Sequence, residues 1–195
     1  MNLVFSFHDQ LFWIHNFLPK NIYKRMYVDF IKNRNKLNLK KSNVSWRTFK
    51  EEVDDMSDSF NQTSIEQLKF FDEYHTLLKH QPFVKLINYN FYSHLRRYKY
   101  GKHLAWHEDD YKGQSTREYA ATFYFNKTWG ESWGGELMFK SSLGSGFIPI
   151  VGNSVVLVKT GLTHKVNPNL KKTHPRLSIQ TWIHKGDKDE INTKL

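Results

Sequence analysis

Hydrophobic and polar residues alternate in short runs over the second half of the chain. A period of two is typical of strands with one buried face, and the aromatic residues in these runs favour β-structure. Glycine, asparagine and proline separate the runs. The predicted strands are Phe83–Asn88, Tyr92–Tyr98, His103–Glu108, Glu118–Asn126, Glu136–Lys140, Gly146–Val151, Ser154–Lys159, Thr163–Val166 and Arg176–His184. Strands of this spacing predict a β-sandwich, a jelly roll or a barrel.

The first third of the chain follows a different pattern. After Pro19, the apolar residues Ile22, Met26 and Phe30 recur every four positions, which predicts an amphipathic helix that begins near the proline. The polar stretch Lys32–Thr63 lacks either period, so we interpret it mostly as loop.

A second helix is expected to begin at Ser64 and to end before Pro82. One face of this helix would carry Ile65, Leu68, Phe71, His75 and Leu78. The two helices are expected to cover one sheet of the strand-rich part.

Composition excludes several classes of site. The chain has 195 residues and no cysteine, so disulfide frameworks, thiolate zinc sites, Fe–S clusters and thiol nucleophiles are excluded. The formal net charge of +10 favours anionic partners, but the basic residues are scattered, as on a solvated surface. No segment resembles a signal peptide or a membrane span, which predicts a cytoplasmic protein without a membrane partner.

Three residues have the chemistry of a metal site. His107 and Asp109 are two positions apart in a predicted strand, so their side chains are expected on one face. His164, at the start of a later strand, would supply a second imidazole. Two histidines and one carboxylate form the facial triad that holds Fe(II) and leaves coordination positions open. Taken singly, the pair also fits a surface strand, and His164 fits a turn histidine.

The ordered set of motifs resembles the prolyl-4-hydroxylase-like branch of the Fe(II)/2-oxoglutarate dioxygenases. The family's first motif strand is matched by Tyr98, Gly101, Leu104, His107 and Asp109. The following motifs are matched by YAATFYFN, NKTWGESWGGELMF, Pro149 with Gly152, the run VVLV, His164, and Arg176 with Ser178. The resemblance covers about Phe83 to His184.

This resemblance implies a mainly β fold, a double-stranded β-helix or jelly roll, with the N-terminal helices packed on one sheet. We expect one domain over 1–195: an N-terminal helical and loop support at 1–82, a jelly-roll oxygenase core at 83–185 and a polar tail at 186–195. The metal ligands it implies are His107, Asp109 and His164. The 2-oxoglutarate-binding residues it implies are Arg176, Ser178, Tyr98 and Tyr124.

The family couples decarboxylation of 2-oxoglutarate, to succinate and CO₂, with oxidation of a C–H bond by O₂. Because Asp109 is kept, the resemblance favours hydroxylation over halogenation. The expected substrate is a prolyl or peptidyl residue, a free amino acid or a small metabolite, with ascorbate as a supporting reductant. We consider the loops Lys32–Thr63, Asp110–Glu118 and Lys127–Trp133, with Arg117 and Trp129 among their residues, as a candidate substrate mouth; solvated loops are the alternative.

Two alternatives stay open. A nucleic-acid dealkylase of the same fold would suit the positive charge. That branch has a second arginine six residues after the co-substrate arginine, where this chain has Trp182, so nucleic acid is not the expected partner. The other alternative is a metal-free jelly-roll module that binds an acidic partner, which would retain no iron.

Overall fold

The computed structural model describes residues 2–33, 39–41, 44–47, 52–55, 58–60, 71–84, 86–109 and 116–186. The larger of two sheets contains, in spatial order, β1 (Asn2–Phe7), β2 (Leu11–His15), β12 (Ser154–Lys159), β9 (Arg117–Tyr124), β14 (Arg176–Lys185), β7 (Tyr89–Tyr98), β6 (Asp58–Phe60) and β3 (Leu39–Lys41). The smaller sheet contains β11 (Gly144–Ile148), β10 (Leu137–Ser141), β13 (Thr163–Val166), β8 (Leu104–His107), β5 (Glu52–Asp55) and β4 (Val44–Arg47).

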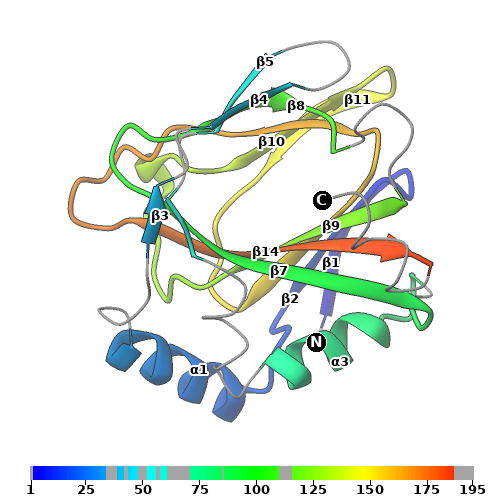
Figure 1. The fold of residues 1–195 in the computed structure, drawn as a ribbon, viewed down its shortest axis with the longest axis horizontal. Helices are drawn as coiled ribbons and strands as arrows, with labels where there is room; N and C mark the ends of the chain where they lie inside the picture. Colours follow the sequence, from blue (N-terminus) through cyan, green and yellow to red (C-terminus); the bar gives the residue numbers. More distant parts are fainter. Residues whose placement is uncertain are drawn as a thin grey trace.

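The two sheets are antiparallel and face each other, as in a jelly roll (Figure 1). Helices α1 (Lys20–Asn33) and α3 (Phe71–Lys79) lie beneath the larger sheet, on the side away from the smaller one. A short 3-10 helix, η1 (Glu131–Trp133), interrupts the loop before β10. Neither α1 nor α3, the helices in the described ranges, has the length and hydrophobicity needed to cross a bilayer.

Strand β12 shows how the sequence builds two cores from one sheet. The buried side chains of β12 point alternately to the two faces of the sheet, as successive side chains of any strand do. Val155 and Leu157 pack in the core beneath the helices. Val156 and Val158 pack in the core between the two sheets. The larger sheet is therefore buried on both faces along this strand.

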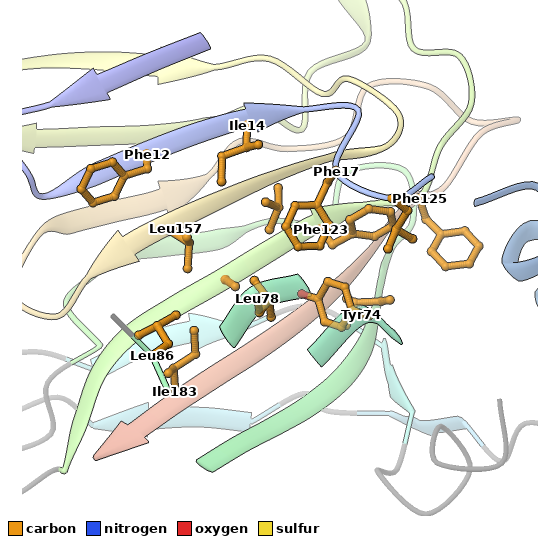
Figure 2. Close-up of a cluster of buried hydrophobic side chains, with 14 of the residues drawn as sticks. Phe12, Ile14, Phe17, Tyr74, Leu78, Leu86, Phe123, Phe125, Leu157 and Ile183 are labelled. Carbon is orange, nitrogen blue, oxygen red and sulfur yellow. The ribbon is translucent and has the colours of Figure 1, made fainter. Parts of the chain in front are cut away.

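The core beneath the helices is rich in aromatic side chains (Figure 2). Tyr74 and Leu78 of α3 are fully buried, and the Tyr74 ring meets Phe123 of β9 edge-on at a centroid distance of 5.7 Å. Met26 of α1 is also fully buried there. The position of Met26 confirms the helix predicted from the four-residue spacing after Pro19.

A buried polar network also joins α3 to the sheet. His75 Nε2 lies 2.8 Å from Ser93 Oγ, which lies 2.8 Å from Thr181 Oγ1. The Tyr74 hydroxyl lies 3.2 Å from the same Thr181 oxygen. Because Ser93 is on β7 and Thr181 is on β14, the network ties the helix to the two neighbouring strands.

Most predicted strands are confirmed, with bounds that differ by a few residues, but two expectations are wrong and one hairpin was not predicted. Residues 2–15 form the hairpin β1–β2, which was not expected. The described parts of Lys32–Thr63 beyond α1 are strands β3 to β6 and not loop, because they add to the edges of both sheets. In Phe83–Asn88 the described residues form turns; Val84 and Leu86 are apolar because they are buried in the helix-side core.

The second predicted helix is confirmed over α3. Its expected start at Ser64, with Ile65 and Leu68, lies outside the described residues.

Replacing Leu78 by Ala should destabilise the fold by about 2–5 kcal/mol, the usual cost of truncating a buried leucine. Leu78 is fully buried between α3 and the sheet. Urea denaturation measures the loss. Leu143→Ala is the matched control, since Leu143 is 57% exposed and should change stability by less than about 0.5 kcal/mol. Equal effects of the two substitutions would contradict this packing.

Stability should fall as the pH drops from about 6.5 to about 4. Burial, and secondarily the charge of Lys79, lower the pKa of His75 from 6.5 to about 4. Within that window the unfolded chain binds a proton at His75 that the folded chain excludes, so acid favours unfolding. His75→Gln should reduce the slope of unfolding free energy against pH by up to about 1.4 kcal/mol per unit. His80→Gln, at an exposed histidine of the same segment, is the comparison variant.

Candidate metal centre and active site

The two histidines of the predicted triad meet because their strands are neighbours. In the antiparallel pair β13–β8, His164 lies directly opposite His107. Their ring centroids are 4.2 Å apart and both side chains are buried. The strand pairing therefore brings both imidazoles to the inner face of the smaller sheet.

Each imidazole is held by a hydrogen bond to a nearby backbone carbonyl. His107 Nδ1 lies 2.9 Å from the carbonyl oxygen of Ala105, and His164 Nδ1 lies 2.8 Å from that of Leu162. A carbonyl only accepts, so each Nδ1 carries a proton, and in the neutral ring each Nε2 then presents a lone pair. Histidine ligands of metals are oriented in this way.

Asp109 completes the group. Its Oδ1 lies 3.8 Å from His107 Nε2 and its Oδ2 lies 3.6 Å from His164 Nε2. One ligand atom from each of the three residues lies within 4.8 Å of the others. In the described part of the chain, this is the only cluster of three or more histidine, aspartate or glutamate residues that could hold a metal ion.

Asp109 is not part of a strand, although the sequence led us to place it beside His107 on one. Strand β8 ends at His107, and Asp109 follows in a bend. Arg117 of β9 donates from Nη1 to the backbone carbonyl of Asp109 at 3.0 Å and lies 3.4 Å from its Oδ1. The position of Asp109 therefore depends on a contact with Arg117 across the roll, and strand periodicity does not predict such a contact.

The Asp109 carboxylate is buried and ionised. Burial raises its pKa, but the interactions with His164, Arg117 and His107 outweigh burial and hold the pKa below its usual value. Oδ1 faces Arg117, whereas Oδ2 is buried and has no hydrogen-bond partner among the residues that the structure describes. A buried carboxylate oxygen without a donor is costly unless a cation or another donor binds it.

Arg176 lies at the start of β14, with its side chain only 1% exposed. Its Nε donates to the carbonyl oxygen of Gly135 at 2.9 Å, and its Nη1 donates to Ser178 Oγ at 2.9 Å. Its Nη2 is buried and has no hydrogen-bond partner in the described ranges. The guanidinium is therefore fixed on two sides and has donor capacity left on the third.

The two tyrosines of the predicted co-substrate site flank this guanidinium. The register pairs Arg176 with Tyr98 on β7, and Ser178 with Tyr124 on β9. The guanidinium carbon lies 5.0 Å from the ring centroid of Tyr98 and 5.2 Å from that of Tyr124. The Tyr124 hydroxyl is buried beside Arg176 and, within the described part of the chain, has no hydrogen-bond partner at normal geometry. Burial raises the pKa of Tyr124, despite the opposing effect of Arg176, so the phenol is protonated at neutral pH.

The second of two adjacent glycines makes room for Arg176. Gly134 and Gly135 have φ angles of +70° and +78°, a conformation that other residues rarely adopt. A Cβ atom on Gly135 would lie 3.2 Å from Cδ of Arg176 and 3.0 Å from Cδ1 of Ile150. Trp129, expected in the substrate mouth, instead donates from Nε1 to the Gly134 carbonyl at 2.8 Å and packs against the core between the sheets.

Sequence reasoning did not connect Arg117 with the metal centre. It placed Arg117 in a candidate substrate mouth, and no local pattern distinguishes an arginine that contacts Asp109 from one on a solvated loop. The remaining histidines lie outside the triad, as expected: His8, His15, His75, His80, His94, His103, His174 and His184.

Comparison with protein families gives a match to the 2OG-Fe(II) oxygenase superfamily over residues 93–184. This segment belongs to the 2OG-Fe(II) oxygenase superfamily. It contains the three residues of the triad, and it also contains Arg176 and Ser178. Comparison with curated proteins finds no match.

Solved structures of 2OG-Fe(II) oxygenases share the fold. A prolyl-4-hydroxylase from Pseudomonas putida is 17% identical with a TM-score of 0.66, and the match covers 91% of this chain and 94% of that one. A prolyl hydroxylase from Trichoplax adhaerens, in complex with a hypoxia inducible factor peptide fragment, is 14% identical with a TM-score of 0.72, over 96% and 88%. The epimerase SnoN from nogalamycin biosynthesis, a non-heme alpha ketoglutarate dependent enzyme, is 10% identical with a TM-score of 0.66, over 91% and 78%.

These likenesses confirm the predicted fold class, a mainly β double-stranded β-helix with N-terminal helices on one sheet.

Proposed function

We propose that this protein is an Fe(II)- and 2-oxoglutarate-dependent dioxygenase that hydroxylates a C–H bond and releases succinate and CO₂. The observation that carries the proposal is the buried group of His107, Asp109 and His164, whose ligand atoms lie within 4.8 Å of one another. Two neutral imidazoles and one carboxylate are the donor set that non-haem Fe(II) oxygenases use.

The residues present fit a ferrous ion. His107 and His164 each present an Nε2 lone pair, because their Nδ1 atoms are held by carbonyls. Asp109 presents an ionised, unpartnered oxygen between them. Iron with 2-oxoglutarate supplies, when both are bound, the activation of O₂ that C–H hydroxylation requires. The protein's part is to fix the three donors and to leave the remaining coordination positions open.

Arg176 fits the distal carboxylate of 2-oxoglutarate. Its free Nη2 and the free hydroxyl of Tyr124 are buried donors without partners in the described residues. Ser178 Oγ accepts from Arg176, which leaves its own O–H to donate. A carboxylate would satisfy these groups together, since charge-assisted hydrogen bonds to arginine are strong and directional. Tyr98 closes the other side of the guanidinium.

The substrate class we propose is a prolyl or peptidyl residue, a free amino acid or a small metabolite. The likeness to prolyl hydroxylases supports a place in the prolyl-4-hydroxylase-like branch, and SnoN illustrates a small-molecule reaction on the same fold. O₂ is the second co-substrate, and ascorbate is the expected supporting reductant. We also propose that residues 1–195 form one cytoplasmic domain. It would consist of an N-terminal helical and loop support at 1–82, a jelly-roll oxygenase core at 83–185 and a polar tail at 186–195.

Replacing either triad histidine should remove Fe(II) binding and succinate formation. His107→Ala and His164→Ala each delete a metal ligand. We therefore expect the affinity for Fe(II) to fall by more than about a hundredfold, which is the largest loss usual for residues that only orient a ligand. Anaerobic Fe(II) titration and succinate release, with 2-oxoglutarate as the only added organic substrate, measure both. His8→Ala, at an exposed histidine of the β1–β2 turn, is the control. Wild-type metal affinity in both triad variants would remove these residues from the site.

Replacing Arg176 by Ala should weaken 2-oxoglutarate binding by about 2–5 kcal/mol, as expected when one partner of a buried charge pair is truncated. Arg176→Lys should recover only part of this, because a lysine lacks the planar set of donors. Titration of the metal-loaded protein with 2-oxoglutarate gives the dissociation constant. Arg25→Ala, at a half-exposed arginine paired with Glu73, should bind like wild type. An unchanged constant in Arg176→Ala would show that the carboxylate binds elsewhere.

A further inference from the structure

The three residues of the triad are not held in the same way. His107 and His164 lie in paired strands, and each ring is oriented by a carbonyl two residues earlier. Asp109 lies two residues past the end of β8, so the ladder between β8 and β13 does not hold its backbone. A ligand in a bend needs another contact to keep its carboxylate in one orientation.

Arg117 supplies that contact at two points. Its Nη1 donates to the backbone carbonyl of Asp109 at 3.0 Å and reaches the carboxylate Oδ1 at 3.4 Å. The first contact fixes where the residue sits, and the second fixes which oxygen faces β9. Oδ2 is left facing His164 Nε2 at 3.6 Å, and it is buried without a hydrogen bond to any described residue.

Arg117 is itself held in place by its surroundings. Its guanidinium carbon lies 4.9 Å from the ring centroid of Trp182 on β14, a distance at which a cation and an aromatic face attract. The Trp182 ring is met edge-on by His94 of β7 at 4.8 Å. Thr160 Oγ1 donates to the Arg117 carbonyl at 2.9 Å. The arginine therefore reaches Asp109 from a strand and a ring that are both fixed by the larger sheet.

We propose that Arg117 is a positioning residue of the metal centre, with Trp182 as the platform on which its guanidinium rests. It occupies Oδ1 of Asp109 and reserves Oδ2 for the metal. Holding the carboxylate to one oxygen keeps coordination positions open for the co-substrates, which is the property that distinguishes a facial triad. The proposal rests on the proposed function, because it requires His107, Asp109 and His164 to be the ligands.

Co(II) binding to the full chain, followed by its visible absorbance, tests this without turnover. Arg117→Met keeps an unbranched, mostly apolar stem but removes the charge and the donors of the side chain. We expect roughly a tenfold to hundredfold loss of Co(II) affinity, the range for residues that orient metal ligands, together with a changed Co(II) spectrum. Arg117→Lys, which keeps a donor and the charge, should recover part of both. Trp182→Phe, which keeps an aromatic face, should lie nearer to wild type than Trp182→Leu.

Arg25→Met is the matched control, since it removes an arginine that lies at the surface in a pair with Glu73. Thermal melting is recorded for every variant, and if Arg117→Met does not fold, Arg117→Lys decides with the same two readouts. Wild-type affinity and an unchanged spectrum in the folded Arg117 variant would overturn the proposal. If His164→Ala also binds Co(II) like wild type, the proposed function fails together with the role of Arg117. If His164→Ala loses Co(II) affinity and the Arg117 variant does not, only the role of Arg117 is overturned.

Discussion

The candidate site depends on one strand pairing, that of β13 with β8, which sets His164 opposite His107. A shift of that register by one residue would turn one imidazole to the outer face of the smaller sheet. Trp106, next to His107, shows what lies there: its ring is covered by the amino groups of Lys140 and Lys165. The apolar neighbours of the two strands fix the register, since Leu137 and Phe139 of β10 lie in the core between the sheets.

Strand β14 connects this pairing with the rest of the site. Its odd-numbered residues, such as Ile179 and Ile183, are buried beneath the helices. Its even-numbered residues include Arg176, Ser178 and Trp182, which carry the polar contacts inside the roll. Packing of the helix-side core therefore fixes the backbone from which the polar groups project. The unpartnered Nη2 of Arg176 costs about 1–3 kcal/mol or more unless a ligand satisfies it, and the bound co-substrate would supply that partner.

Sequence reasoning recovered the parts of the fold that have a local period. The strands from Tyr92 onward and the helix after Pro19 alternate or repeat clearly, and the structure confirms them. The strand predicted at Phe83–Asn88 is wrong. Val84 and Leu86 are buried residues in turns, so their apolar character does not indicate a strand. The short strands β3 to β6 were not predicted, because edge strands gain their hydrogen bonds from residues distant in the sequence and no local pattern records these bonds.

Among the site residues, too, some were predicted from the sequence and one was not. The resemblance to family motifs was enough to predict that His107, Asp109 and His164 lie together, because such motifs preserve the order of contacts in a fold. Arg117 was recognised only as a basic residue of a loop. Its contact with Asp109 spans the roll, and its support comes from Trp182 on a third strand.

Both arginines of the site are supported by side chains of β14, Ser178 and Trp182, which lie four residues apart on the same face of the strand. Ser178 accepts from Arg176 near one end, and the Trp182 ring carries Arg117 nearer the other. β14 pairs with β7 on one side and with β9 on the other along most of its length, so its backbone has little freedom to move. A strand fixed on both edges keeps the distance between two arginines constant. The Asp109 carboxylate and the proposed co-substrate carboxylate are therefore positioned relative to one another by a single rigid element.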